Sequence, residues 1–416
     1  MRRFLSFISI IILAATLSCS KQSDPSSLAF VSLTVGGVAL GVVTQPNIPS
    51  NATIVACMNS DINPASVNSN SIKLVRRFDT VNVDLTITVA GSTISIVPKT
   101  NLGNGIYYDL TFSNIIATDG TSMIYIWRAF STIGAFGPPG LVAYWNFNGN
   151  TYDQQGNYTV NSVTDLNYAP SFRRSLGQCA AFNGTSTLIE VSNGDKLVNT
   201  SDFSVSFWVK ANSLYQLDSL GKRKGQMVFG VGDAKGFEFE IASDYSSCKL
   251  VSSFALPDGT TISEELAFAG DGKTWSNGGL PGWTYCMDLS PYGGFEAMVK
   301  DQWVFVCCTY KSATKISTMY LNGLRMKEQD FNKWPAGDPA RNITGMKYGG
   351  TAPARENLLA VGFFHSAMST EFSGTSWGNY YSPYANHFRG WLDELRVFQT
   401  ALTTSEVVEM YYQTMP

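Results

Sequence analysis

Hydrophobic and polar residues alternate along much of the chain. Over residues 84–89, leucine, isoleucine and valine occupy every second position, with aspartate and threonine between them. A period of two places the apolar side chains on one face of an extended strand, so this segment predicts a half-buried β-strand. Residues 90–92, Ala-Gly-Ser, predict a turn into the alternating residues 93–96, and together these segments predict a hairpin.

The same pattern returns in the second half of the chain. Over residues 203–209, phenylalanine and valine fill the odd positions, and Ser204, Ser206 and Trp208 fill the even ones. One face of this predicted strand belongs to a core, and Trp208 on the other face needs cover from a second layer or from a loop. Segments of this kind predict an all-β fold of packed sheets.

The first residues follow a different pattern. Two arginines precede an apolar stretch from Phe4 to Ala15 that only two serines interrupt. This stretch is too short for a permanent transmembrane helix, which needs about 20 apolar residues. We therefore expect residues 1–18 to be a cleavable signal peptide.

Cys19 follows the apolar stretch directly, within the sequence Thr-Leu-Ser-Cys. This segment resembles the lipobox of bacterial lipoproteins, which implies a diacylated Cys19 and a lipid anchor in the membrane. Residues 19–27 are polar and predict a tether. Ser20 favours the outer membrane over the inner one and does not distinguish its two faces. Because lipoboxes prefer leucine where Thr16 stands, the alternative is an ordinary signal peptide followed by an incidental cysteine.

Charge and residue usage limit the chemistry that we expect. The 416 residues include 15% charged and 13% aromatic residues, and the net charge is −3 without a basic block. Nucleic acid is therefore not an expected partner. Only His365 and His387 supply imidazole groups, and no Cys-x-x-Cys or Gly-rich phosphate loop occurs. We expect a protein that is not an enzyme and has no catalytic residues.

Seven cysteines are present in the chain. Four of them lie in apolar, strand-like runs, where a free thiol behaves as a small hydrophobic side chain: Cys57, Cys179, Cys307 and Cys308. An extracytoplasmic compartment permits disulfides. Free buried thiols are the main expectation, and a bridge between Cys248 and Cys286 is left open.

Residues 28–135 combine alternating strands with glycine turns in a specific order. A strand is followed by a proline, a leucine before a glycine turn, a tyrosine strand, a second glycine turn and a closing Phe-x-Thr; the residues are Pro98, Leu102, Gly105, Tyr108, Gly120, Phe130 and Thr132. This order resembles the bacterial Ig-like domains of surface-layer proteins. The resemblance implies an Ig-like β-sandwich that acts as a spacer.

Residues 136–140, Phe-Gly-Pro-Pro-Gly, predict a stiff linker and a domain boundary. Seven motifs follow in order, at residues 141–149, 180–184, 203–210, 303–310, 320–323, 390–398 and 401–407. Their order resembles that of laminin-G-like, concanavalin A-like jelly rolls. The resemblance implies that residues 141–416 form a second β-sandwich.

The jelly-roll resemblance also implies a metal site. Such domains often hold a structural Ca²⁺, which prefers about six to eight oxygen ligands. Asp393 lies among apolar neighbours on the predicted last strand, where an unpaired charge is costly. By resemblance Asp393 is a calcium ligand, with Asn146 or Asn148 opposite. The alternative is an aspartate that is hydrogen-bonded or faces solvent.

Two insertions in the second domain are rich in aromatic residues. The first contains Trp275, Trp283 and Tyr285, and the second contains Trp377, Tyr380 and Tyr381. Sugars stack on aromatic rings, and exposed aromatic groups mark interaction sites, so these six residues are the predicted ligand-binding residues. The alternative is that the rings fold back as small cores that hold the two long loops.

Together these features predict an outer-membrane or cell-surface lipoprotein whose jelly roll binds a polysaccharide or surface glycan. A structural or adhesive protein with protein partners is the alternative, because one fold hosts many functions. A laminarinase-like glycoside hydrolase is the third hypothesis. Its carboxylates would be Glu238 and Glu240, although their spacing is also that of the polar face of any strand.

Overall fold

The computed structural model describes residues 27–134, 136–173, 177–212, 216–273 and 284–415. The chain divides into two compact units, residues 1–136 and residues 137–416. Among the described residues, no helix is both long and apolar enough to cross a membrane. Cys19 and two predicted ligand-binding residues, Trp275 and Trp283, lie outside the described residues.

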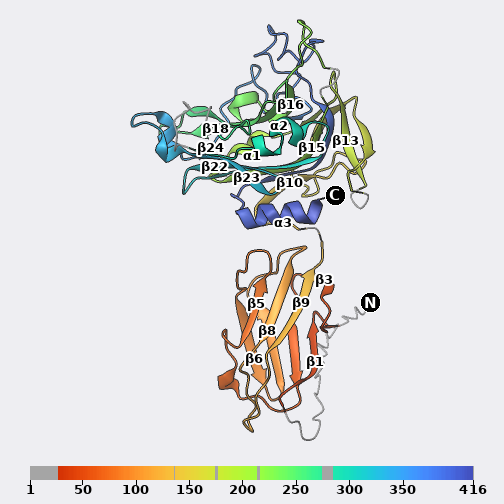
Figure 1. The fold of residues 1–416 in the computed structure, drawn as a ribbon, viewed down its shortest axis with the longest axis vertical. Helices are drawn as coiled ribbons and strands as arrows, with labels where there is room; N and C mark the ends of the chain where they lie inside the picture. Colours follow the sequence, from red (N-terminus) through yellow and green to blue (C-terminus); the bar gives the residue numbers. More distant parts are fainter. Residues whose placement is uncertain (1–26, 135, 174–176, 213–215, 274–283, 416) are drawn as a thin grey trace, which may run out of the picture. The chain divides into compact units, whose positions relative to one another are not determined.

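Two sheets form the first unit (Figure 1). Within the described residues their strand orders are β2-β1-β4-β7-β6 and β3-β9-β8-β5. The strands are β1 (Phe30–Val35), β2 (Val38–Ala39), β3 (Gln45–Ile48), β4 (Ile54–Met58), β5 (Ile72–Arg76), β6 (Leu85–Ala90), β7 (Thr93–Pro98), β8 (Tyr107–Phe112) and β9 (Ile126–Thr132), with the short 3-10 helix η1 (Pro64–Ser66). Phe30 and Phe112 meet across the sheets with 5.0 Å between ring centroids, so the sheets share one core. The predicted hairpin is formed by β6 and β7.

The second unit is also a sandwich of two sheets. Within the described residues, one sheet has nine strands in the order β12-β13-β26-β15-β21-β22-β23-β20, with β10 beside β26. Its strands are β10 (Leu141–Trp145), β12 (Asn167–Pro170), β13 (Gln178–Asn183), β15 (Phe203–Ala211), β20 (Thr284–Cys286), β21 (Val304–Lys311), β22 (Ile316–Leu321), β23 (Leu324–Asp330) and β26 (Arg389–Phe398). We call it the first sheet of this unit.

The second sheet of this unit has eight strands in the described residues, in the order β11-β14-β25-β16-β17-β18-β19, with β24 beside β18. Its strands are β11 (Val160–Thr164), β14 (Leu188–Val191), β16 (Gln226–Val231), β17 (Phe237–Ile241), β18 (Cys248–Ala255), β19 (Thr261–Phe268), β24 (Gly345–Met346) and β25 (Leu359–Val361). The helices are α1 (Asp195–Val198), α2 (Gly294–Val299), α3 (Thr404–Thr414), η3 (Asp233–Lys235), η5 (Ser290–Tyr292), η6 (Phe331–Lys333) and η7 (Pro339–Asn342). The predicted all-β class, with an Ig-like sandwich followed by a larger one, is confirmed.

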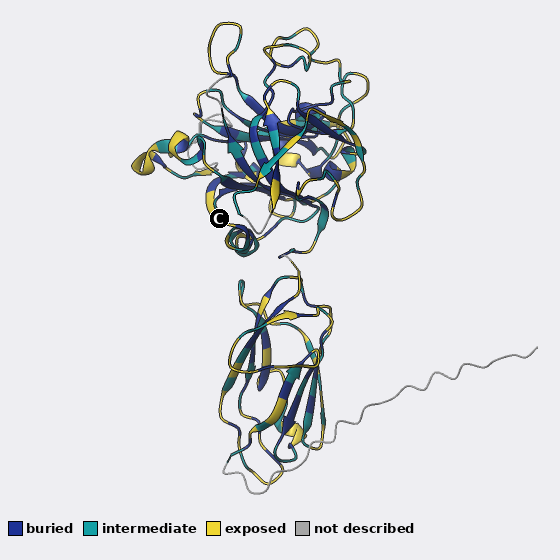
Figure 2. Cartoon of the chain, turned by 90° about the vertical axis from the view of Figure 1, so that its right-hand side faces the viewer, coloured by how far each residue is buried: buried dark blue, intermediate teal, exposed yellow. Residues whose placement is uncertain are grey.

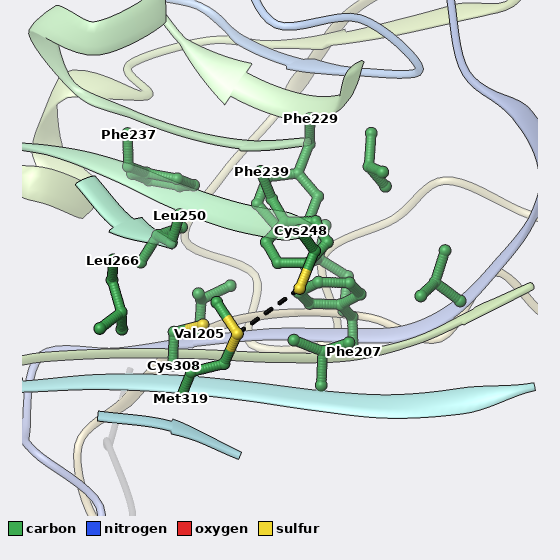
Figure 3. Packing of buried hydrophobic residues seen from close by; sticks show 14 of the residues in the cluster. Val205, Phe207, Phe229, Phe237, Phe239, Cys248, Leu250, Leu266, Cys308 and Met319 are labelled. Carbon is green, nitrogen blue, oxygen red and sulfur yellow. Dashed lines mark hydrogen bonds between the residues drawn. The ribbon is translucent and has the colours of Figure 1, made fainter. Parts of the chain in front are cut away.

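Aromatic rings fill the space between the two sheets of the second unit. Phe207 of β15 contacts Phe229 and Phe239 of the facing sheet, each with 4.9 Å between ring centroids. In the same core the Cys248 thiol approaches Met319 Sδ at 3.6 Å (Figure 3). Nearly all residues of the central strands β15 and β21 are buried, whereas many loop residues are exposed (Figure 2). The odd positions of residues 203–209 thus face the core, as the alternation predicts.

Helix α3 covers the outer face of the first sheet at Trp208. The Trp208 ring stacks with Tyr411, and its Nε1 donates a hydrogen bond of 2.9 Å to Thr414 Oγ1. Thr403 begins the helix with a capping box, because its side chain accepts from the Glu406 backbone and the Glu406 carboxylate accepts from the Thr403 backbone. The cover that Trp208 needs is therefore an amphipathic helix.

Strand β26 contains a bulge that sets which of its side chains face outward. Arg396 lies opposite Ser206 and Asp393 lies opposite Trp208, so β26 has one residue more than β15 between these pairs. Glu394, with a φ of +55°, lies within the bulge. Leu392, Leu395 and Val397 belong to the core, whereas Asp393 shares the outer face with Trp208.

The cysteines of the second unit are free thiols: Cys179, Cys248, Cys286, Cys307 and Cys308. The bridge left open between Cys248 and Cys286 is therefore absent from this structure. Cys57 is disulfide-bonded, so the expectation of a free thiol at that position is wrong. The apolar run around Cys57 indicates burial, and burial carries no information about oxidation.

Maleimide labelling of the folded protein should modify Cys286 before the other four free cysteines. Cys286 is half-buried, whereas Cys179, Cys248, Cys307 and Cys308 are almost fully buried. Burial closes the approach to these four thiols and raises the pKa of each of them. Peptide mapping by mass spectrometry measures the order, and labelling in guanidinium chloride should reach all five. Early labelling of Cys308 would contradict this packing.

Candidate functional site

A pocket of about 300 Å³ opens on the outer face of the first sheet of the second unit. Eight residues line it: Asn167, Ala181, Phe182, Asn183, Asn212, Arg389, Gly390 and Trp391. They come from β12, β13 and β26 and from the end of β15, which are neighbours in the sheet. We call it the Trp391 pocket.

Trp391 forms one wall of this pocket. Strand register places Ala181 of β13 on one side of Trp391 and Lys210 of β15 on the other. The Lys210 Nζ lies 5.4 Å from the centroid of the indole ring, within range of a cation–π interaction. Because Ala181 is small, it leaves the opposite flank of the half-buried ring open. Asn167 continues the same row beyond Ala181.

Asn183 and Asn167 differ in their hydrogen bonding. The Asn183 Oδ1 accepts hydrogen bonds from the backbone N–H groups of Thr185, Ser186 and Thr187, at 2.8, 2.9 and 3.1 Å. Asn183 therefore holds the turn at the rim of the pocket. Asn167 is exposed on β12, where its amide offers both donors and an acceptor.

The backbone beneath the pocket is held by buried amides. The Arg389 N–H donates to Gln226 Oε1 at 3.0 Å, and the Asn212 N–H donates to the Arg389 carbonyl at 2.9 Å. A Cβ on Gly184, whose φ is +80°, would lie 1.8 Å from Gln216 Nε2 and 2.8 Å from Arg389 Cβ. Only glycine fits there, so this side of the pocket is closely packed.

The second aromatic insertion folds mainly onto itself. Phe364 stacks on Trp377 with 5.7 Å between ring centroids, and the cluster also includes Phe363, His365, Phe372, Tyr380 and His387. Glu190 of β14 attaches this loop to the sheet, because its Oε1 accepts from Ser366 Oγ at 2.6 Å and from the Ala367 N–H at 3.0 Å. The ring contacts of this insertion agree with the alternative interpretation, in which its aromatic residues form a small core that holds the long loop.

The four predicted ligand-binding aromatics that lie within the described residues do not form one site. Tyr380 is half-buried and donates to the Ser186 carbonyl at 2.6 Å, whereas Trp377 and Tyr381 are 40% and 75% exposed. Tyr285 takes no part in this cluster: it lies on β20 of the first sheet, with the Arg325 guanidinium 4.2 Å from its ring centroid. Of the four described residues, only Trp377 and Tyr381 thus present an exposed ring on the folded loop.

Both histidines are buried inside the folded loop. His387 Nε2 donates to the Tyr380 carbonyl at 2.8 Å, while its Nδ1 has no hydrogen-bond partner. Burial lowers the pKa of His387 to about 4. Residues 374–378 have the Gly-x-Ser-x-Gly spacing of a nucleophile elbow, but they form turns rather than a strand and a helix. Both ring nitrogens of His365 face backbone carbonyls, so this loop does not contain a Ser-His pair there.

The predicted calcium ligands each have protein partners. Asp393 is fully buried; its Oδ2 is 2.6 Å from Ser171 Oγ, and its Oδ1 accepts from the Glu394 N–H at 2.9 Å. Burial raises the pKa of Asp393 to about 8, which favours a neutral acid. Asn146 Oδ1 and Asn148 Oδ1 accept backbone N–H groups. No cluster of three or more metal-binding side chains occurs among the described residues. This donor set does not fit Ca²⁺, and the calcium site stays a prediction.

Glu238 and Glu240 face outward from β17 with one residue between them. Glu238 is 8% exposed, its Oε2 has no hydrogen-bond partner, and burial raises the pKa of its carboxyl well above the ordinary value. Glu240 is paired with Lys249 at 3.0 Å. Gly230, opposite Glu238, lies directly under the Phe364 carbonyl, so the folded loop covers this part of the sheet. The expectation that the chain is not an enzyme stays a prediction.

Sequence reasoning missed Trp391 as a site residue. It placed Trp391 inside the closing strand motif, between Gly390 and Leu392. Leu392 belongs to the core, so period-two alternation alone places Trp391 on the outer face. The residues that make a pocket around the ring come from strands far apart in the sequence, and their register cannot be obtained from composition.

Comparison with known proteins identifies the first unit. Residues 42–132 match the family of bacterial Ig-like domains. No curated protein matches the chain.

Solved structures resemble part of the chain at low identity. The receptor binding domain of botulinum neurotoxin type G is 12% identical, with a TM-score of 0.38 over 66% of this chain and 51% of that one. The binding domain of Paraclostridial Mosquitocidal Protein 1 is 16% identical, with a TM-score of 0.41 over 65% and 52%. Domain 4 of AbnA, a GH43 extracellular arabinanase from Geobacillus stearothermophilus solved with arabinotriose, is 20% identical, with a TM-score of 0.35 over 65% and 98%. The chain spans about half the length of the two toxin domains, and likeness at this level says nothing about function.

Calcium should leave the stability of the protein unchanged. Asp393 Oδ1 and Oδ2 are engaged by protein groups, so a cation would have to displace them. Thermal unfolding in millimolar calcium and in EGTA measures the effect, and the two midpoints should agree. A calcium-dependent rise in the midpoint that disappears in Asp393→Asn would restore the predicted metal site.

Acidification should destabilise the second unit through His387. Its pKa is about 4 in the folded chain and about 6.5 in an unfolded one, so the unfolded state binds the proton more tightly. The stabilisation is complete above about pH 6.5 and is lost as the pH falls toward 4, by up to about 1.4 kcal/mol per pH unit. Urea unfolding at about pH 7 and pH 5 measures this loss. The His387→Gln variant keeps a hydrogen-bond donor but does not titrate, so its free energy of unfolding should fall less than that of the wild type between these two pH values. The control variant Tyr381→Phe should show the same fall as the wild type.

Proposed function

We propose that the second unit binds carbohydrate in the Trp391 pocket. The observation that carries this proposal is the half-buried indole that lies beside the small Ala181 on a sheet face. A pyranose presents an apolar C–H face, which packs on an indole, and a rim of hydroxyls, which amides such as Asn167 can bind. A volume of about 300 Å³ is at the lower end for ligand sites and suits one or two sugar rings.

Strand pairing and backbone hydrogen bonds around the pocket indicate that the site is formed before a ligand binds. Ala181, Trp391 and Lys210 are fixed by strand pairing, and the Arg389 backbone is fixed by Gln226 and Asn212. Binding groups on paired strands lose little conformational freedom when a ligand binds, and this reduces the free-energy cost of association.

The cellular setting of this site is proposed from the sequence. The apolar stretch before Cys19 and the polar residues 19–27 support a lipoprotein of the outer membrane or cell surface. The match of residues 42–132 to bacterial Ig-like domains supports a spacer role for the first unit. The lipid on Cys19 and the outer-membrane location are part of this proposal.

A protein partner is the second candidate, and the folded aromatic loop favours it. Trp377, Tyr381, Tyr384 and Met368 are each at least 40% exposed on this loop. Exposed aromatic and methionine side chains in one segment are typical of protein interfaces. This surface is separate from the residues that line the Trp391 pocket.

Replacement of Trp391 by alanine should weaken sugar binding. We expect an affinity loss of about tenfold to a hundredfold, equivalent to about 1.4–2.7 kcal/mol, because the stacking wall is removed. A glycan array followed by calorimetry measures it. Tyr381→Ala, on the folded loop, is the matched control and should bind as the wild type does. If Tyr381→Ala loses binding and Trp391→Ala keeps it, the loop is the binding surface and the pocket is not.

A further inference from the structure

Large apolar side chains are exposed at one end of the first unit. Ile124, Tyr125 and Trp127 lie within four consecutive residues and are 69%, 64% and 42% exposed. Ile116 is also exposed and belongs to the same end, because it forms a β-bridge with Ser122, two residues before Ile124. Exposed isoleucine, tyrosine and tryptophan in so short a segment indicate a contact surface. We call Ile116, Ile124, Tyr125 and Trp127 the Ile124 surface.

The described part of the chain begins beside this surface. Leu28 forms a parallel β-bridge with Met123, the residue directly before Ile124. The Ser27 carbonyl accepts a hydrogen bond from Asn59 Nδ2 at 3.1 Å, so Ser27 is also held at this end of the unit. The Ile124 surface therefore lies at the end of the first unit that is joined to residues 19–26.

The distance from Cys19 to this surface is limited by chain length. Ser27 stands eight positions after Cys19. Eight residues span at most about 28 Å when fully extended. A lipid on Cys19 would therefore keep the Ile124 surface close to the lipid headgroups. A link this short makes contact with the bilayer an intramolecular event, so a weak affinity for the bilayer surface is sufficient.

The Trp127 side chain suits the boundary between water and lipid. Its Nε1 donates a hydrogen bond to Asp109 Oδ1 at 3.1 Å, and Asp109 is also paired with Arg77 at 2.7 Å. The one polar group of the indole is thus engaged within the protein, and the other ring atoms are carbon. Tryptophan and tyrosine are enriched at membrane–water interfaces, where their rings lie at the level of the headgroups.

Charge does not explain this surface. None of its four residues is charged, and the turn between Ile116 and Ser122 carries the exposed carboxylate of Asp119. Attraction to anionic headgroups requires clustered lysine or arginine side chains. The apolar side chains themselves therefore supply the affinity, and a zwitterionic lipid is a sufficient partner.

We propose that the Ile124 surface lies in the headgroup region of a lipid bilayer and orients the first unit on the membrane. This inference rests on the proposed lipid at Cys19. A lipid anchor limits only the distance between a domain and the membrane. Four apolar side chains in the interface limit the orientation of the domain as well.

Fluorescence quenching by brominated lipid tests this contact on the full chain with its natural N-terminus. The chain is extracted from membranes in detergent and reconstituted into phosphatidylcholine vesicles, with or without bromine on the upper part of the acyl chains. Bromine quenches a tryptophan only at short range. Brominated vesicles should therefore remove the emission that Trp127 contributes among the nine tryptophans of the chain.

Variants at exposed positions locate the contact. Trp127→Phe should abolish the quenching. Ile124→Ser combined with Tyr125→Ser should reduce it at least about twofold, because serine does not favour the interface. Ile133→Ser is the matched control, since Ile133 is also exposed but follows the opposite end of β9, and it should leave the quenching unchanged. Circular dichroism confirms that each variant is folded.

Mass spectrometry of the N-terminal peptide separates this inference from the location on which it rests. A lipid on Cys19 together with equal emission from brominated and plain vesicles would keep the anchor and overturn the membrane contact. Quenching that persists at the wild-type level in Trp127→Phe would place another tryptophan at the bilayer and would also overturn it. A wild-type chain without lipid on Cys19 would overturn both.

Discussion

Burial of strand β26 in the middle of the first sheet is the constraint on which the second unit depends. Leu392, Leu395 and Val397 supply one face of the strand to the core, and β13, β10 and β15 pair with its edges. Its outward side chains therefore have fixed positions. At one end Trp391 borders an open pocket, and further along Asp393 is covered and fully buried. The outer face of β26 is thus open at Trp391 and fully covered at Asp393.

The fold followed from sequence patterns because period-two alternation is a local property. Residues 84–96 and 203–209 show which side chains face a core without any knowledge of their partners. The bulge at Glu394 could not be anticipated, since an extra residue relative to β15 is a relation between two strands. That bulge keeps Asp393 on the outer face while Leu392 and Leu395 both remain in the core.

The candidate site was predicted less well for a related physical reason. Trp377 and Tyr380 have the composition of a binding loop, yet the loop uses aromatic rings to build its own small core around Phe364 and His387. A loop of this length needs buried apolar area to remain ordered. Composition alone cannot distinguish rings that order a loop from rings that bind a ligand. Trp391 stands out only when its cross-strand neighbours Ala181 and Lys210 are known.

The origin of the pocket in strand register has a consequence for control of binding. A site on a hinged loop can open and close, and its occupancy then depends on a conformational equilibrium as well as on the ligand. Ala181, Trp391 and Lys210 are set by the same backbone hydrogen bonds that make the sheet. Any folded molecule therefore presents the pocket in its competent form, and its occupancy would follow the local concentration of ligand, as in a passive receptor rather than a switch.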